Sequence, residues 1–207
     1  MKLANIKKIV EIARHLDQKN LVNTYEGNVS ICDEGLLYIT PSATPKSSLT
    51  DELVCVIDLA TGKQISGVCK PSSELPMHTD AYGVRDNINA VIHCHPPYLT
   101  AYAVCNTPVA TRSYPEMIAL FKVIEVAKYG RPGTKAIFED ARKILAHANV
   151  VLLANHGVLA VADCIELACS RIEAAEAIAQ VLFLASQLGT PAELPASEVE
   201  YLMNIDH

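Results

Sequence analysis

Ala90-Val91-Ile92-His93-Cys94-His95 decides how this chain folds, because it predicts a buried strand that ends in two histidines. Side chains two residues apart on a strand point to the same face, so His93 and His95 form a pair of neighbouring imidazoles. A third candidate, His156, follows another apolar run. Three imidazoles from two strand ends can hold a divalent metal and leave one coordination position open for a substrate.

Two features favour a metal site over the alternative, in which these histidines are ordinary polar residues at a strand end. The strand meets Pro96-Pro97, where side chains leave the core, and Gly157 after His156 allows backbone and metal to approach closely. Zinc, or another divalent ion such as manganese or cobalt, fits imidazole ligands, and the residues alone do not choose among these ions. Cys94 points to the opposite strand face and is expected to be a core residue.

Glu74 is the candidate carboxylate of the site. It follows Ser72 and Ser73 where a helix is expected to begin. The carboxylate could act as a metal ligand or a general base, or it could simply complement the helix dipole. His78, four residues further on the same helical face, is a less favoured ligand that could orient Glu74.

Short turns rich in small polar residues predict an anion site beside these groups. Ser72 and Ser73 present hydroxyls and amides at a helix start, and Gly27-Asn28 and Thr40-Pro41-Ser42-Ala43 could add further donors. A phosphate held there, next to a metal and a carboxylate, indicates chemistry on a phosphorylated carbonyl compound. The alternative is that these are ordinary Ser, Gly and Asn turns.

The hydrophobic periodicity predicts an α/β chain in which helices and strands interleave irregularly. Strands are expected at 28–32, 36–40, 53–58, 89–93, 150–154 and 158–162, and helices at 3–18, 73–85, 97–104, 135–147 and 163–188. This order suggests a mixed sheet between helical layers. Residues 1–207 are expected to form one domain, with a loosely held tail from about residue 189.

Composition excludes several classes of function. The net charge of −6 argues against a nucleic-acid partner, and no apolar stretch is long enough to span a bilayer. The N-terminus is amphipathic and does not resemble a signal peptide. Seven cysteines are scattered through apolar segments, which is typical of reduced thiols in a cytoplasmic protein.

Five motifs, taken together, make the chain resemble the class II aldolase/adducin family from about residue 5 to 188. These motifs are Glu26-Gly27-Asn28-Val29-Ser30, Ile39-Thr40-Pro41-Ser42, Ser72-Ser73-Glu74, the pair His93 and His95, and Asn155-His156-Gly157-Val158-Leu159. The resemblance implies a three-layer α/β/α fold with a central mixed, largely antiparallel sheet. It also implies a homotetramer with the active site at a subunit interface.

The resemblance assigns a role to each candidate residue. His93, His95 and His156 match zinc ligands, Glu74 matches the catalytic acid/base, and Tyr114 falls where family aldolases carry a proton-donating tyrosine. Positions of the phosphate pocket are matched by Gly27, Asn28, Ser42, Ala43, Ser72 and Ser73. The family usually has glycine where this chain has Ala43, so a methyl group there could strain the backbone or crowd the phosphate.

The implied reaction is the cleavage of a ketose 1-phosphate, such as L-fuculose 1-phosphate or a related deoxy-ketose phosphate, to dihydroxyacetone phosphate and an aldehyde. The same fold also allows a methylthioribulose 1-phosphate dehydratase, a sugar-acid phosphate decarboxylase or a pentulose-phosphate 4-epimerase. The epimerase branch has Ser-Ser-Asp where this chain has Ser-Ser-Glu. A non-catalytic adducin-like module is disfavoured because all three histidines and Glu74 are present, and a structural zinc site because four protein ligands would be expected.

Overall fold

A computed structural model describes residues 2–205, and a single mixed sheet runs through this part of the chain. The strand order is β4-β3-β2-β1-β5-β8-β7-β6. The strands are β1 (Asn28–Asp33), β2 (Leu36–Ile39), β3 (Cys55–Asp58), β4 (Lys63–Ser66), β5 (Ala90–Cys94), β6 (Val126–Ala127), β7 (Val150–Leu153) and β8 (Gly157–Ala162). Neighbouring strands are antiparallel except β6 and β7, which are parallel. The predicted largely antiparallel mixed sheet is confirmed.

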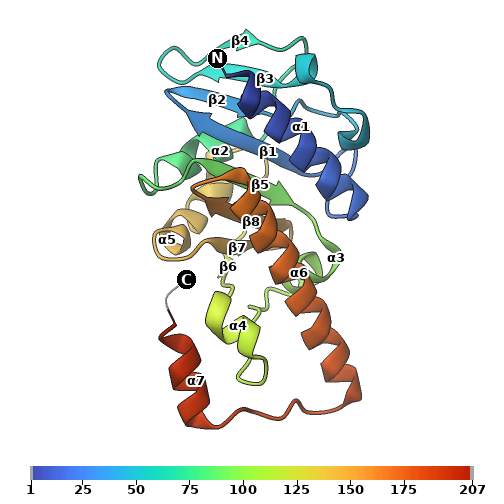
Figure 1. The fold of residues 1–207 in the computed structure, drawn as a ribbon, viewed down its shortest axis with the longest axis vertical. Coiled ribbons are helices and arrows are strands. Elements are labelled where there is room, and N and C mark those ends of the chain that lie inside the picture. Colours follow the sequence, from blue (N-terminus) through green and yellow to red (C-terminus); the bar gives the residue numbers. More distant parts are fainter. Residues whose placement is uncertain (1, 206–207) are drawn as a thin grey trace.

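Helices cover both faces of this sheet, which gives the predicted three layers (Figure 1). The helices are α1 (Leu3–Gln18), α2 (Leu75–Tyr82), α3 (Pro97–Val104), α4 (Pro115–Leu120), α5 (Ala141–Leu145), α6 (Ile165–Leu188) and α7 (Ala196–Met203). Buried residues of α1, α3 and α6 share one core cluster, whereas those of α2 and α5 belong to a second cluster. None of the described helices is long and apolar enough to cross a membrane.

Strand β5 lies in the middle of the sheet and is buried along its whole length. Ile92 and Cys94 contact the cluster under α1, α3 and α6, and Val91 contacts the cluster under α2 and α5. This is the alternation expected of a pleated strand with both faces covered. Cys94 is therefore a core residue, as predicted, and His93 faces the side of the sheet that carries α2.

Two predicted helices are shorter than expected. The helix expected at 73–85 is α2, which begins only at Leu75 and ends before Gly83. Proline lacks an N–H and is best tolerated in the first turn, so Pro76 favours a start at this point. The helix expected at 135–147 is interrupted between a 3-10 turn at Lys135–Phe138 and α5. At the break the Asp140 carboxylate accepts a hydrogen bond from the Lys128 backbone N–H.

The segment after Gly189 contains helix α7, which the sequence analysis did not include. Val199 of α7 is buried, and α7 packs against α4, while an extended segment separates α7 from the end of α6 (Figure 1). The Leu194 backbone N–H also donates to the carbonyl oxygen of Arg112 at 2.9 Å. Helix α4 and the two-residue strand β6 were likewise not predicted, since each is too short to show a hydrophobic period.

Candidate metal centre and substrate pocket

The three predicted histidines come together at one end of the sheet. His93 is in β5, His95 follows it, and His156 lies in the turn between β7 and β8. One ring nitrogen from each lies within 4.8 Å of the other two, and the ring centroids are 4.7–4.8 Å apart. The β5–β8 pairing causes this meeting, because Cys94 lies opposite Val158.

Hydrogen bonds to the outer ring nitrogens orient two of the imidazoles. His93 Nδ1 donates to the carbonyl oxygen of Val158 at 2.9 Å, which turns its Nε2 toward the other rings. His95 Nε2 lies 2.9 Å from His93 Nε2, while His95 Nδ1 lies 3.4 Å from a carboxylate oxygen of Glu26. Carboxylate and backbone partners of this kind commonly orient metal-bound histidines.

Two glycines allow the site to be this compact. A Cβ added to Gly157 would lie 2.6 Å from both the Cys94 carbonyl oxygen and the His95 ring. Gly27 has a φ of +83°, and a Cβ there would collide with Val22. Any side chain at Gly157 would push His95 away from His156, so the predicted need for glycine in this turn has a steric cause.

Glu74 completes the metal face from the start of α2. Its Oε2 lies 3.3 Å from His93 Nε2, and its Oε1 lies 3.7 Å from His156 Nε2. Oε1 is buried and has no hydrogen-bond partner among the described residues. A buried carboxylate oxygen without a partner is costly. A divalent cation between this oxygen and the imidazoles would offset the cost of burying the oxygen. The residues therefore fit a metal.

The electrostatics of the histidines suit a metal face. Burial, reinforced by His95 and His156, lowers the pKa of His93 well below its usual value. Burial also lowers the pKa of His156, although Glu74 opposes that shift. Both imidazoles are therefore neutral near pH 7, which is the form that binds metal.

A pocket of about 370 Å³ opens beside this cluster. Its lining consists of Tyr25, Glu26, Gly27, Ser73, Glu74, His95, Pro132, Gly133 and His156. Gly27 and Ser73 of the predicted phosphate pocket thus border the metal face directly. Asn28 and Ser72 are buried behind Glu74: the Asn28 amide donates to Glu74 Oε2 at 2.8 Å, and the Glu74 N–H donates to Ser72 Oγ at 3.2 Å.

Ser42 and Ala43 lie on the neighbouring loop. The Ser42 N–H donates to the Lys70 carbonyl and the Ser72 N–H to the Thr40 carbonyl, so this loop runs antiparallel to the chain entering α2. Ala43 has a φ of +49°. The left-handed region is unfavourable for a residue with a Cβ, so the backbone is strained at Ala43.

Tyr114 does not line the pocket of its own chain. It precedes α4 and packs, half-buried, against the larger core cluster. His78 does not join the metal cluster either, because its two ring nitrogens contact Ser30 and Asn28. Sequence reasoning gave no role to Glu26, Pro132 or Gly133, since no local pattern marks loop residues that reach a site from elsewhere in the chain.

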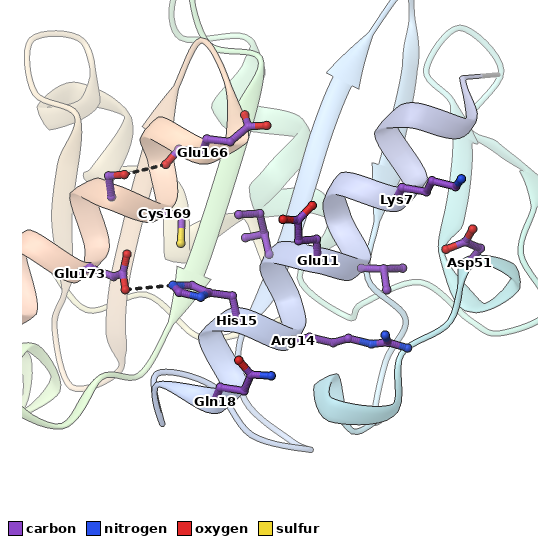
Figure 2. A pocket seen from close by; sticks show the side chains of 12 residues that line it. Lys7, Glu11, Arg14, His15, Gln18, Asp51, Glu166, Cys169 and Glu173 are labelled. Carbon is purple, nitrogen blue, oxygen red and sulfur yellow. Dashed lines mark hydrogen bonds and ion pairs between the residues drawn. The ribbon is translucent and has the colours of Figure 1, made fainter.

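A larger cavity of about 720 Å³ lies between α1 and α6, away from the predicted site (Figure 2). It holds another group of possible ligands, His15, Cys169 and Glu173. His15 Nε2 lies 3.0 Å from a Glu173 carboxylate oxygen, and Lys19 Nζ lies 3.8 Å from the same oxygen. These contacts already explain the grouping, so we assign it no ligand.

Fold and site together define a sheet-based domain with a three-histidine, one-carboxylate face. Residues 7–183 match the class II aldolase and adducin N-terminal domain, and the chain belongs to this family. A 5-deoxy-D-ribulose 1-phosphate aldolase of Bacillus thuringiensis serovar kurstaki is 34% identical, over 95% of this chain and 92% of that protein. An L-fuculose phosphate aldolase of Methanococcus maripaludis is 33% identical, over 89% of this chain and 99% of that protein.

The fold matches a solved structure of an L-fuculose 1-phosphate aldolase with a TM-score of 0.88. That chain is 32% identical, and the match covers 98% of this chain and 96% of the other. The predicted family and the predicted class of enzyme, a lyase of the aldolase type, are confirmed.

Proposed function

We propose that this protein is a divalent-metal-dependent aldolase that cleaves a ketose 1-phosphate to dihydroxyacetone phosphate and an aldehyde. The observation that carries the proposal is the convergence of His93, His95, His156 and Glu74 beside a pocket. Residues 1–207 would act as one catalytic domain. A non-catalytic role is disfavoured, because a module that only binds other proteins does not need a buried carboxylate oxygen without a hydrogen-bond partner, as in Glu74.

His93, His95 and His156 would hold the metal, with zinc as the expected ion and manganese or cobalt as alternatives. When bound, the cation would supply Lewis-acid stabilisation of the charge that develops on the substrate oxygens. Imidazole binds a metal in its neutral form, so a face of three imidazoles would leave the full charge of such a cation available for this purpose.

Glu74 is the proposed acid/base. Its carboxylate lies on the imidazole cluster and also borders the pocket, so a substrate there comes within reach of its oxygens. A general base works only within hydrogen-bond distance of the proton that it moves. Glu74 would transfer the proton at the carbon next to the substrate carbonyl.

The phosphate would lie at the start of α2. Gly27 and Ser73 border the pocket, and the loop with Ser42 and Ala43 runs beside the chain that enters the helix. Backbone amides and hydroxyls at a helix start favour an anion. Asn28 and Ser72 would contribute from behind this surface, and the strained Ala43 would weaken the site relative to glycine.

Oligomerisation is proposed to complete the site. The second half of α6 exposes large apolar side chains, with Val181, Phe183, Leu184 and Leu188 between 43% and 92% accessible. Apolar patches of this kind mark interfaces, which supports a homotetramer. Because Tyr114 does not reach its own pocket, we propose that it serves the aldehyde oxygen in a neighbouring subunit's site. Seven free cysteines suit a cytoplasmic location.

The substrate is proposed to be L-fuculose 1-phosphate or a related deoxy-ketose phosphate, in line with the names of the relatives. A screen of deoxy- and methylthio-ketose 1-phosphates tests this, with a coupled reductase to detect dihydroxyacetone phosphate. Only carbon–carbon cleavage releases that product. Release of water or carbon dioxide, or isomerisation alone, would instead identify the dehydratase, decarboxylase or epimerase.

A further inference from the structure

Side chains of α2 and β1 interleave beneath the metal face. Glu74, His78 and Tyr82 are spaced four residues apart along one side of α2, and Asn28 and Ser30 are two apart on β1. Four helical residues rise about 6 Å. Two strand residues rise about 6.6 Å. The two repeats match, so helix and strand side chains can alternate in one row.

Hydrogen bonds connect every member of this row to the next. Tyr82 OH lies 2.5 Å from Ser30 Oγ, and Ser30 Oγ lies 2.6 Å from His78 Nδ1. His78 Nε2 contacts Asn28 Oδ1, and Asn28 Nδ2 lies 2.8 Å from Glu74 Oε2. Ser30 and His78 are fully buried, so water cannot replace these bonds.

The direction of each hydrogen bond in the row follows from the Glu74 carboxylate at its end. An ionised carboxylate can only accept, so Asn28 must turn its NH₂ toward Glu74 and its oxygen toward His78. His78 must then carry its proton on Nε2 and accept at Nδ1 from the Ser30 hydroxyl. Burial lowers the pKa of His78 to about 3, so the ring stays neutral and keeps one donor and one acceptor.

We propose that His78 is a positioning residue, whose Nε2–H tautomer holds the Asn28 amide in the orientation that donates to Glu74. This inference rests on the proposed function, since Glu74 is the acid/base there. Without the Nε2–H donor, the Asn28 oxygen has no partner at His78, and the amide is free to rotate away from the orientation that donates to Glu74. Glu74 would lose the bond that holds it between the imidazoles and the pocket.

The first test reads the tautomer directly in the wild-type protein. Nitrogen-15 chemical shifts of selectively labelled histidine distinguish a protonated Nε2 from a protonated Nδ1, and His78→Gln identifies the His78 signals by their disappearance. We expect a neutral ring with the proton on Nε2 at pH 7 and at pH 5. A proton on Nδ1 would overturn the proposal whatever the activity of the enzyme.

The second test compares two amide replacements of the same ring. Glutamine can place an N–H near the position of Nε2, whereas the shorter asparagine reaches only the position of Nδ1. The readout is deuterium exchange into dihydroxyacetone phosphate in D₂O without aldehyde, with the KM and kcat of exchange separated. Metal content and thermal unfolding are measured for both variants, and Thr79→Ala, on the exposed side of α2, is the control.

His78→Asn should lower kcat for exchange by about 100-fold, as a misplaced catalytic group does. The kcat of His78→Gln should stay within about 10-fold of the wild-type value. The kcat of the control Thr79→Ala should equal the wild-type value. Equal losses in both amide variants, at equal metal content, would mean that His78 only fills space and would overturn the proposal. If the wild-type protein itself catalyses no exchange, the proposed function fails, and the tautomer measurement alone decides the positioning role.

Discussion

Asn28 and His93 lie directly opposite each other across the antiparallel β1–β5 pair. Opposed residues of neighbouring strands direct their side chains to the same face of the sheet. The register therefore brings the amide that contacts Glu74 next to the most buried imidazole of the metal face. A slip of one residue would turn one of the two side chains to the other face and dismantle the site.

Loss of one imidazole should remove the metal and the activity together. We expect His95→Ala to retain almost no zinc after dialysis and to release no detectable dihydroxyacetone phosphate, because the substitution removes one of the groups that would bind the ion and leaves an empty space at its position. Metal analysis and the coupled assay measure the two losses. His147→Ala, at an exposed histidine outside the site, is the control. Full turnover by metal-free His95→Ala protein would end the metal-dependent hypothesis.

Glu26 should tune metal affinity through His95. Its carboxylate faces the outer nitrogen of that ring at 3.4 Å. We expect Glu26→Gln to weaken zinc binding by roughly 10-fold, as is common when the partner of a metal-bound histidine is changed. Competition with a chromophoric chelator measures this affinity. The control is Glu11→Gln on α1, and an unchanged affinity in Glu26→Gln would show that the contact is incidental.

Ala43→Gly should stabilise the protein and improve binding of the phosphate. Glycine relieves the strain of the positive φ at this position, and we expect a gain of about 0.5–1 kcal/mol in the free energy of unfolding. A lower KM for the sugar phosphate should accompany it. Urea denaturation and steady-state kinetics measure the two effects. The control Ala177→Gly, inside α6, should instead lower the free energy of unfolding by about 1 kcal/mol. A similar decrease in Ala43→Gly would show that the backbone is not strained at residue 43.

His78 should make stability depend on pH. Its pKa is about 3 in the folded protein against a usual value of 6.5. Between these values the unfolded chain binds a proton that the folded chain does not, so stability falls as pH falls from about 6.5 toward 3. The contribution is on the order of a few kcal/mol. Urea denaturation of metal-free protein at several pH values should show a shallower decline for His78→Gln than for wild type.

The exposed apolar side of α6 should be needed for assembly. Leu184 is 48% accessible in the single chain. We expect Leu184→Asp to convert a tetramer into smaller species, because a charge would be buried at the interface without a partner. Light scattering coupled to gel filtration measures the mass. Gln187→Asp, one turn further along α6, is the control, and a tetramer of unchanged mass in Leu184→Asp would locate the interface elsewhere.

Helix α1 could be predicted from the sequence because its apolar residues repeat with the helical period, and the central strands because they are short continuous apolar runs. Ile6, Ile9, Val10, Ala13 and Leu16 are the buried residues of α1, in agreement with the predicted apolar face. The His93, His95 and His156 cluster was equally accessible, since strand alternation and a glycine turn determine where these rings point. Helix α7 was missed because it is only eight residues long and follows a segment with Pro191 and Pro195, which indicates a loop.

The sequence by itself determined which three histidines meet, the faces of the central strands and the family of this protein. These properties depend on residue identity and on spacings of a few residues. Only the tertiary structure decided that Glu26 reaches His95, that Tyr114 stays away from its own pocket, and that Asn28 contacts both His78 and Glu74. The contacts of Glu26 with His95 and of Asn28 with His78 and Glu74 join residues that are 46 to 69 positions apart, and no local periodicity encodes which surfaces of a chain will meet.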